Sequence, residues 1–265
     1  MKIAFCFFGH TGSWSGKDVL ENKITPKIAI DNYKNFLFKN YEADIFIHSW
    51  SKEYKNEIDE ALKPKKSFYE IQKDFSNITI SEYSNYSNAQ NLTNDAIKLD
   101  GLENIKENED LIYRSQSRWY SNSESLKLML NYSELNKIKY DWVMQLRFDL
   151  FFFKAVNFEK LDPLYLYSPN RNHEKNIAIN DHYFISNHEN AKKFSKIKEN
   201  SLKLSIRPTC AAKQFLDLQG INQKDHFDVE IDFHLIRWIH KDINKFKFKL
   251  KRFIKKILRF INVKR

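Results

Sequence analysis

The segment DWVMQLRFDLFFF, residues 141–153, reads as a buried strand that is interrupted by two charged side chains. Its many apolar and aromatic residues are typical of a strand that is covered on both faces of a parallel sheet. Arg147 and Asp149 stand two positions apart, and residues at i and i+2 of a strand point to the same face. Burying a charge without a partner is costly. The segment therefore predicts either a structural ion pair or a functional site at the end of the strand.

Two other apolar segments also end in polar residues. KIAFCFF (2–8) precedes the loop residues GHT (9–11), and ADIFIHSW (43–50) ends in a His-Ser-Trp sequence. Between them, residues 25–41 show helical periodicity with Pro26 at the first helical position. This alternation predicts a parallel α/β sheet with right-handed crossovers. Because ligands bind at the carboxyl ends of the strands in such sheets, we expect the polar ends to converge.

The rest of the chain predicts one large α/β domain over residues 1–242, with a mostly parallel central sheet flanked by helices. We expect a long helix over residues 110–137 and strands at 164–168 and 178–186. The polar, Asn-rich stretch 76–108 is interpreted as an insertion or a mobile loop.

Cysteine use and hydropathy predict a cytoplasmic protein. The two cysteines, Cys6 and Cys210, lie far apart and have no metal-site spacing, which argues against a disulfide framework and a zinc site. The first apolar run is too short for the core of a signal peptide, and no stretch is long enough to cross a bilayer.

The net charge of +10 is concentrated at the C-terminal end. Residues 243–265 hold ten of the 44 Lys and Arg and no acid, so the remaining 34 cations balance the 34 acids of residues 1–242. In this segment apolar residues recur at spacings of three and four, which predicts a basic amphipathic helix lying in a membrane interface. The residues expected at the membrane are Lys251, Arg252, Phe253, Lys255, Lys256, Ile257 and Arg259.

Two other interpretations of this segment are open, namely a helix docked on the protein's own core and an arm that binds nucleic acid. A docked helix rarely needs ten cations, and each Lys or Arg near an anionic surface contributes about 1 kcal/mol. We therefore expect a peripheral position on the inner face of the cell membrane, and no nucleic-acid partner.

Several segments, taken in order, resemble bacterial GT-A-type glycosyltransferases of capsule and lipooligosaccharide biosynthesis. DWVMQLRFDLFFF is similar to a strand of these proteins with an Arg-x-Asp-Leu pattern. KIAFCFFGH is similar to their nucleotide-binding first strand, EADIFIHSW to the second strand, YRSQSRWYSNSESLKLM to the helix before the Arg-x-Asp strand, and AINDHYFISN to the strand beyond it. The likeness is discontinuous within residues 1–190, and the order of the segments carries it.

This resemblance implies a GT-A-like nucleotide-binding fold that transfers a sugar from a nucleotide-sugar donor to a surface polysaccharide or a lipid-linked glycan. The residues that it implies for binding of the nucleotide sugar are Phe8, Gly9, His10, Thr11, Arg114, Gln116, Arg147 and Asp149.

The resemblance also implies a divalent cation, Mn or Mg, at Asp149. The wider GT-A class has an Asp-x-Asp motif in this place, whereas this chain has Arg147 as the first residue of the motif. A guanidinium can itself hydrogen-bond a phosphate in bidentate fashion and so do part of the work of a cation.

An inverting transferase also needs a general base for the acceptor hydroxyl. Asp181 and Glu230 are the candidates, and the alternatives are that Asp181 caps a turn and that Glu230 belongs to a solvated acidic face. Arg114 and Arg118 stand four residues apart on the predicted long helix and could approach phosphates together, the alternative being a solvated helix face.

Two other functions are compatible with the sequence. The first is a non-enzymatic peripheral membrane or RNA-binding protein, built on a degenerate α/β scaffold, in which the basic segment is the functional part. The second keeps the fold but transfers a nucleotidyl or phosphoryl group instead of a sugar.

Overall fold

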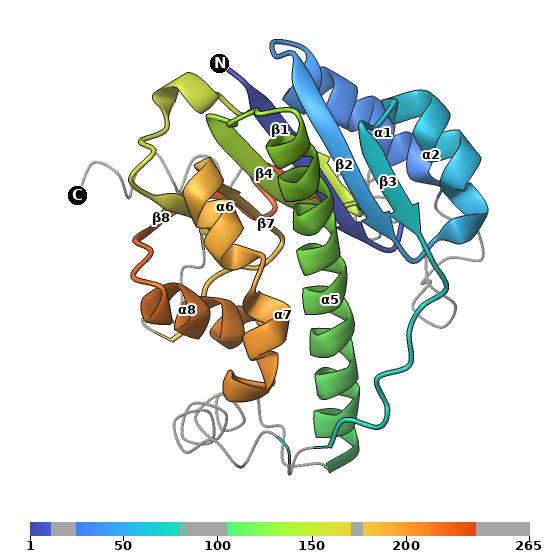
Figure 1. The fold of residues 1–265 in the computed structure, drawn as a ribbon, viewed down its shortest axis with the longest axis vertical. Helices are drawn as coiled ribbons and strands as arrows, with labels where there is room; N and C mark the ends of the chain where they lie inside the picture. The colour runs from blue at the N-terminus through green and yellow to red at the C-terminus, as the bar shows by residue number, and fades with distance from the viewer. Residues whose placement is uncertain (12–24, 80–81, 83–104, 171–176, 237–265) are drawn as a thin grey trace.

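A computed structural model describes residues 1–11, 25–79, 82, 105–170 and 177–236 of the chain (Figure 1). Within these ranges, a seven-stranded sheet forms the centre of the molecule and helices cover both of its faces.

The strands are β1 Ile3–Gly9, β2 Ala43–Ser49, β3 Lys66–Tyr69, β4 Trp142–Arg147, β5 Leu150–Phe152, β6 Leu166–Asn170, β7 Tyr183–Ser186, β8 Gln223–Asp228 and β9 Phe233–Leu235. The α-helices are α1 Pro26–Tyr33, α2 Lys55–Leu62, α5 Ile105–Leu135, α6 His188–Phe194, α7 Ile197–Asn200 and α8 Pro208–Leu218. A π-helical turn, Lys34–Phe38, extends α1, and short 3-10 turns occur at Lys52–Tyr54, Phe158–Lys160 and Ser201–Lys203.

The strand order is β3-β2-β1-β4-β7-β6-β8. Strands β3, β2, β1 and β4 are parallel, β7 runs antiparallel to both of its neighbours, and β6 and β8 are parallel to each other. The predicted fold class, a mostly parallel α/β sheet flanked by helices, is confirmed. The chain builds outward from β1 to β3 and then returns to the other side of β1 with β4. The order of the strands therefore reverses between β1 and β4, which is where open α/β sheets bind their ligands.

The apolar sequence of β1 explains its central position, because both of its faces are covered. Phe5 and Phe7 pack into the core on the side of α1, whereas Ala4 and Cys6 pack into the core on the side of α5. All four side chains are fully buried, as the continuous apolar run predicts.

Helix α5 is the longest element and runs across one face of the sheet, beside α6, α7 and α8 (Figure 1). It confirms the helix predicted over residues 110–137 and begins earlier, at Ile105. Residues 80–81 and 83–104 of the predicted insertion 76–108 lie outside the described residues.

The expected strand 141–153 is in fact two strands. Strand β4 ends at Arg147, Phe148 and Asp149 form a turn, and β5 pairs with β9 in a separate two-stranded sheet. The prediction of one continuous strand was wrong because α1 binds the backbone of the turn through polar side chains, a tertiary effect that strand periodicity does not show.

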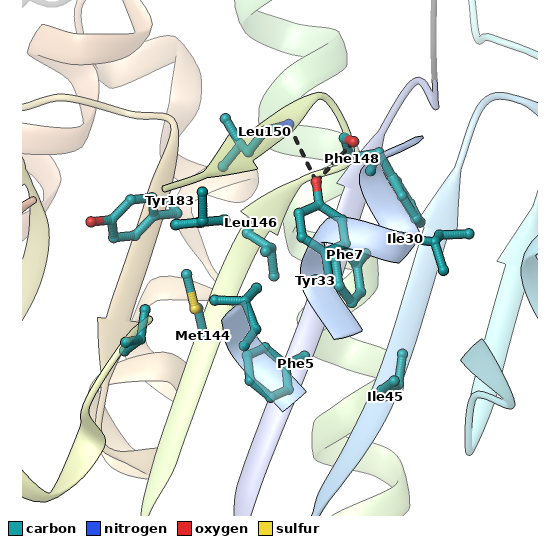
Figure 2. Close-up of a cluster of buried hydrophobic side chains, with 14 of the residues drawn as sticks. Phe5, Phe7, Ile30, Tyr33, Ile45, Met144, Leu146, Phe148, Leu150 and Tyr183 are labelled. Atoms are coloured by element: carbon teal, nitrogen blue, oxygen red, sulfur yellow. Dashed lines mark hydrogen bonds between the residues drawn. The ribbon is translucent and has the colours of Figure 1, made fainter. Parts of the chain in front are cut away.

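Tyr33 of α1 is the main contact with this turn. Its hydroxyl donates to the carbonyl of Phe148 at 2.8 Å and accepts from the N–H of Leu150 at 3.2 Å, as Figure 2 shows. The neighbouring Asn32 donates to the carbonyl of Phe152 and accepts from its N–H. The side chain of Tyr33 is fully buried among Phe7 and other core residues, so the turn that carries Asp149 is tied to the core.

We expect Tyr33→Phe to lower the free energy of unfolding by about 1–3 kcal/mol, because it leaves buried backbone groups of the turn without their partner. Urea unfolding followed by circular dichroism measures this change. Tyr165→Phe is the control, since no hydrogen bond of the Tyr165 hydroxyl exists within the described residues. Equal midpoints for the two variants would contradict the role assigned to the Tyr33 hydroxyl.

The basic amphipathic segment 243–265, including all residues predicted at the membrane, lies outside the described residues. Among the described helices, none combines the length and apolar character that crossing a membrane requires.

Candidate functional site

The polar ends of the first strands lie at one edge of the sheet, as predicted. Phe8 of β1 stands in register with His48 of β2 on one side and with Arg147 of β4 on the other. The residues that follow these positions therefore leave the sheet at the same level. The site that they form is centred on the reversal of strand order between β1 and β4.

Gly9 begins the first loop with a φ of +93°, a conformation that side-chain-bearing residues rarely adopt. Its N–H donates to the hydroxyl of Ser121 at 2.8 Å, and its carbonyl accepts from the hydroxyl of Ser49 at 2.9 Å. The N–H of Thr11 donates to the hydroxyl of Ser51 at 3.0 Å. Serines from α5 and from the end of β2 thus hold the loop, and its contact with a nucleoside stays a prediction.

The side chains of His10 and Phe8 both contact other residues of the protein. The His10 Nε2 lies 2.8 Å from the amide oxygen of Gln72, whose nitrogen donates to the hydroxyl of Ser117 on α5. The ring of Phe8 is buried, and the guanidinium carbon of Arg118 lies 5.3 Å from its centroid. The Phe8 ring therefore packs against the guanidinium of Arg118. Because the ring is buried, the structure does not support its predicted direct contact with the nucleotide.

Five side chains near the ends of β1 and β4 form what we call the charged cluster: Arg118, Arg147, Asp149, Asp181 and His182. The Arg147 Nε donates to Asp149 Oδ1 at 2.7 Å, and its Nη2 donates to Oδ2, so the pair is bidentate. The Arg118 Nε lies 3.1 Å from Asp181 Oδ2. With the imidazole neutral, the cluster holds two positive and two negative charges.

The fold brings these residues together from three parts of the chain. Arg147 ends β4, Arg118 projects from α5, and Asp181 and His182 immediately precede β7. Because β7 is antiparallel to β4, its first residue pairs with Leu146, next to Arg147. The carbonyl of His182 also accepts from the N–H of Arg147 at 3.4 Å.

The electrostatics keep the Arg118–Asp181 ion pair charged at neutral pH. Burial lowers the pKa of Arg118 to about 10, which still leaves it protonated. Burial raises the pKa of Asp181, but Arg118 and Arg147 outweigh this and hold it below its usual value. An aspartate with a lowered pKa that is paired with an arginine is a weak base, so the arrangement suits Asp181 better as a partner of Arg118 than as a general base.

His182 is held in its neutral form. Burial is the main cause that lowers its pKa, to about 3, and Arg147 and Arg118 act in the same direction against Asp181. Its Nδ1 is buried and makes no hydrogen bond to any described residue. In β8, burial and Lys154 likewise lower the pKa of His226 to about 4, and its Nδ1 lies 2.8 Å from the Tyr183 hydroxyl.

We expect the free energy of unfolding to fall as the pH drops from about 6.5 toward 4. In the unfolded chain these histidines bind a proton near pH 6.5, whereas in the folded chain His182 and His226 stay neutral to about 3 and about 4. Protons therefore favour the unfolded state, with a slope of up to about 1.4 kcal/mol per pH unit for each histidine. Urea unfolding at several pH values measures the slope, which His226→Gln should reduce. An unchanged slope in that variant would contradict the assignment.

The structure does not bring Arg114 or Gln116 into the charged cluster. Arg114 is half exposed, and its Nη2 pairs with Asp110 of the same helix at 2.7 Å, whereas Arg118 is paired with Asp181. The amide oxygen of Gln116 is buried and accepts from the ammonium of Lys198 at 2.6 Å and the hydroxyl of Ser201 at 3.1 Å. Their nucleotide-binding roles are therefore not supported by their contacts.

Glu230 lies in the turn between β8 and β9. Its φ is +69°, and its N–H donates to the carbonyl of Phe233 at 2.7 Å. Phe233, the first residue of β9, packs edge-on against His182. Strand β9 therefore lies beside the charged cluster. The role of Glu230 as a base stays a prediction.

Two buried amides next to the cluster were missed by sequence reasoning. Gln145 precedes Arg147 by two residues on β4, and Asn122 follows Arg118 by one helical turn on α5. Both side chains are fully buried, and neither makes a hydrogen bond to any described residue. The available signal was a glutamine in the middle of an otherwise apolar strand, since such a residue needs a partner.

The donor atoms do not fit the predicted divalent cation. Both carboxylate oxygens of Asp149 accept from Arg147, and Asp181 is paired with Arg118. Among the described residues, no three Asp, Glu, His or Cys side chains are grouped as a metal site. A hard cation such as Mg²⁺ would have to separate the Arg147–Asp149 pair to reach its ligand.

Comparisons with known proteins show distant structural likeness. No protein-family profile and no curated protein matches the sequence. A nucleoside-diphosphate-sugar pyrophosphorylase from Vibrio cholerae RC9 is 8% identical over 89% of this chain and 95% of that chain, with a TM-score of 0.41. Mouse xyloside xylosyltransferase 1 in its apo form is 9% identical over 85% of each chain, with a TM-score of 0.41. A glycosyltransferase involved in glycosylation of the major capsid of PBCV-1 is 7% identical over 87% and 93%, with a TM-score of 0.36. At these values, none of the likenesses carries a functional argument.

Proposed function

We propose that the protein is a GT-A-like glycosyltransferase that uses a nucleotide-sugar donor. The observation that carries the proposal is the meeting of two guanidiniums, those of Arg118 and Arg147, at the carboxyl edge of the sheet where the strand order reverses. Arginine forks match phosphate oxygens in bidentate geometry, so this edge is chemically suited to a diphosphate. The order of the resembling segments along the chain supports the same class of enzyme.

The chemistry of sugar transfer explains what these groups would do. As the bond from the sugar to the diphosphate breaks, positive charge develops on the sugar and negative charge develops on the leaving diphosphate. Fixed cations beside the leaving group stabilise that charge without reorganising during the reaction. Asp149 would hold the fork of Arg147 in place, and the Tyr33 contact would hold the turn that carries Asp149.

The acceptor that we propose is a growing surface polysaccharide or a lipid-linked glycan on the inner face of the cell membrane. The support is the basic amphipathic sequence of residues 243–265, which is suited to an anionic membrane surface. A peripheral enzyme placed there would act where such lipid-linked acceptors lie.

A donor screen tests the proposed function. We expect the full chain to release a nucleoside diphosphate slowly from at least one nucleotide sugar and faster when a glycan acceptor is present. Mass spectrometry of the products distinguishes sugar transfer from nucleotidyl or phosphoryl transfer. If no nucleotide sugar is turned over, and if removing residues 243–265 alone abolishes membrane or RNA binding, the non-enzymatic alternative is the better account.

A further inference from the structure

We infer that Arg118 and Arg147 bind the donor diphosphate in place of a divalent cation, so that the enzyme works without a metal; this inference rests on the proposed function. The two carboxylates, Asp149 and Asp181, would then be counter-ions that hold the guanidiniums ready before the donor arrives.

The first support is the geometry of the Arg147–Asp149 pair. The Nε and Nη2 atoms of Arg147 already face two oxygens of one anionic group, which is also the arrangement that a phosphate accepts. Arg147 is the most open member of the two pairs, with 23% of its side chain exposed, against 15% for Asp149. Of the two partners, the Arg147 side chain is therefore the more accessible to solvent.

The second support is the incomplete bonding of Arg118. Its Nε lies near Asp181, yet neither Nε nor Nη2 makes a hydrogen bond with proper geometry to any described residue, although both atoms are buried. Buried donors without acceptors are rare in folded proteins. Phosphate oxygens beside Arg147 would offer such acceptors to Arg118.

The third support is the balance of charge. A divalent cation on Asp149 would stand beside two guanidiniums, and it would also remove the carboxylate that compensates Arg147. Like charges that lie close together in a partly buried site repel each other strongly. A diphosphate would instead take the place of the carboxylates at the two guanidiniums, and Asp149 and Asp181 would have to turn away from it.

Isothermal titration calorimetry with inorganic pyrophosphate, and with a panel of UDP, GDP, ADP, CDP and TDP, tests this inference in excess EDTA and again with Mn²⁺. We expect pyrophosphate and one of the nucleotides to bind in EDTA, and Mn²⁺ should not strengthen that binding. Arg147→Gln should weaken that binding by about tenfold or more, because it removes charged hydrogen bonds. Lys27→Gln is the matched control, since it removes a cation from an exposed pair on α1.

Asp149→Asn separates the two interpretations of the site. If Asp149 only positions Arg147, the variant should still bind pyrophosphate in EDTA, because both guanidiniums remain. If Asp149 is a metal ligand, binding should need Mn²⁺ in the wild type and be lost in this variant, and that result would overturn the inference.

Two further outcomes complete the test. The double variant Arg147→Gln/Asp149→Asn leaves no single charge unpaired, so its loss of binding cannot be attributed to a lone buried charge; retained wild-type affinity in it would also overturn the inference. If no pyrophosphate or nucleotide binds in either buffer, the proposed function fails, whereas binding that needs Mn²⁺ refutes only the metal-free inference.

Discussion

Replacing Arg147 with glutamine is expected to lower kcat/KM for donor turnover by about 10²- to 10³-fold, the range measured when one preorganised group that stabilises a developing anion is removed. The reason is the position of the side chain at the end of β4, where the strand order reverses and Asp149 holds the guanidinium. The measurement is release of nucleoside diphosphate from the donor that the screen identifies.

In the Arg147→Gln variant, a loss of stability must be distinguished from a loss of catalytic activity. Arg147→Gln leaves Asp149 without its bidentate partner, which by itself destabilises the turn. Thermal unfolding of the variant, together with the activity of Arg147→Gln/Asp149→Asn, makes the separation. A well-folded Arg147→Gln protein with wild-type turnover would contradict the role of Arg147.

The second large effect is expected at the other ion pair. Asp181→Ala should lower the free energy of unfolding by about 3–5 kcal/mol, because it leaves the guanidinium of Arg118 buried without a compensating charge. Only 11% of the Arg118 side chain and 14% of the Asp181 side chain are exposed, so water cannot readily replace the lost partner. Urea unfolding at neutral pH measures the change.

A double replacement tests the cause of this effect. Arg118→Met/Asp181→Asn removes both charges and keeps similar volumes, so it should recover most of the stability that Asp181→Ala loses. Asp31→Ala, which breaks an exposed pair with Lys27, should leave the unfolding midpoint nearly unchanged. If the double variant is no more stable than Asp181→Ala, an unpaired buried charge is not the cause.

Much of the fold could be predicted from sequence because its signals are local. The apolar run of β1 and the periodicity of α5 each indicate the correct element, and parallel strands with polar ends imply a shared edge. The end of β4 could not be predicted in this way. It depends on hydrogen bonds from Asn32 and Tyr33, which lie more than a hundred residues earlier in the chain.

The position of the site in the fold could be predicted from sequence, but the partners of its charged side chains could be predicted only in part. Arg147 and Asp149 were recognised as a same-face pair, and the structure shows that they bind each other. The spacing of Arg114 and Arg118 indicated joint action, but Arg114 finds an acid one turn earlier on its own helix, whereas Arg118 packs over Phe8 and meets Asp181. Helical periodicity predicts which residues share one face of a helix. Tertiary packing then determines which residue on that face is buried.

The most direct test of the central claim is a crystal structure of the full chain with the nucleoside diphosphate that binds most tightly. We predict that the diphosphate lies against the Arg147 guanidinium, with Arg118 within hydrogen-bond distance, and that the Arg147–Asp149 pair has opened or rotated to admit it. A diphosphate bound elsewhere, with both ion pairs as they are in the free protein, would contradict the account.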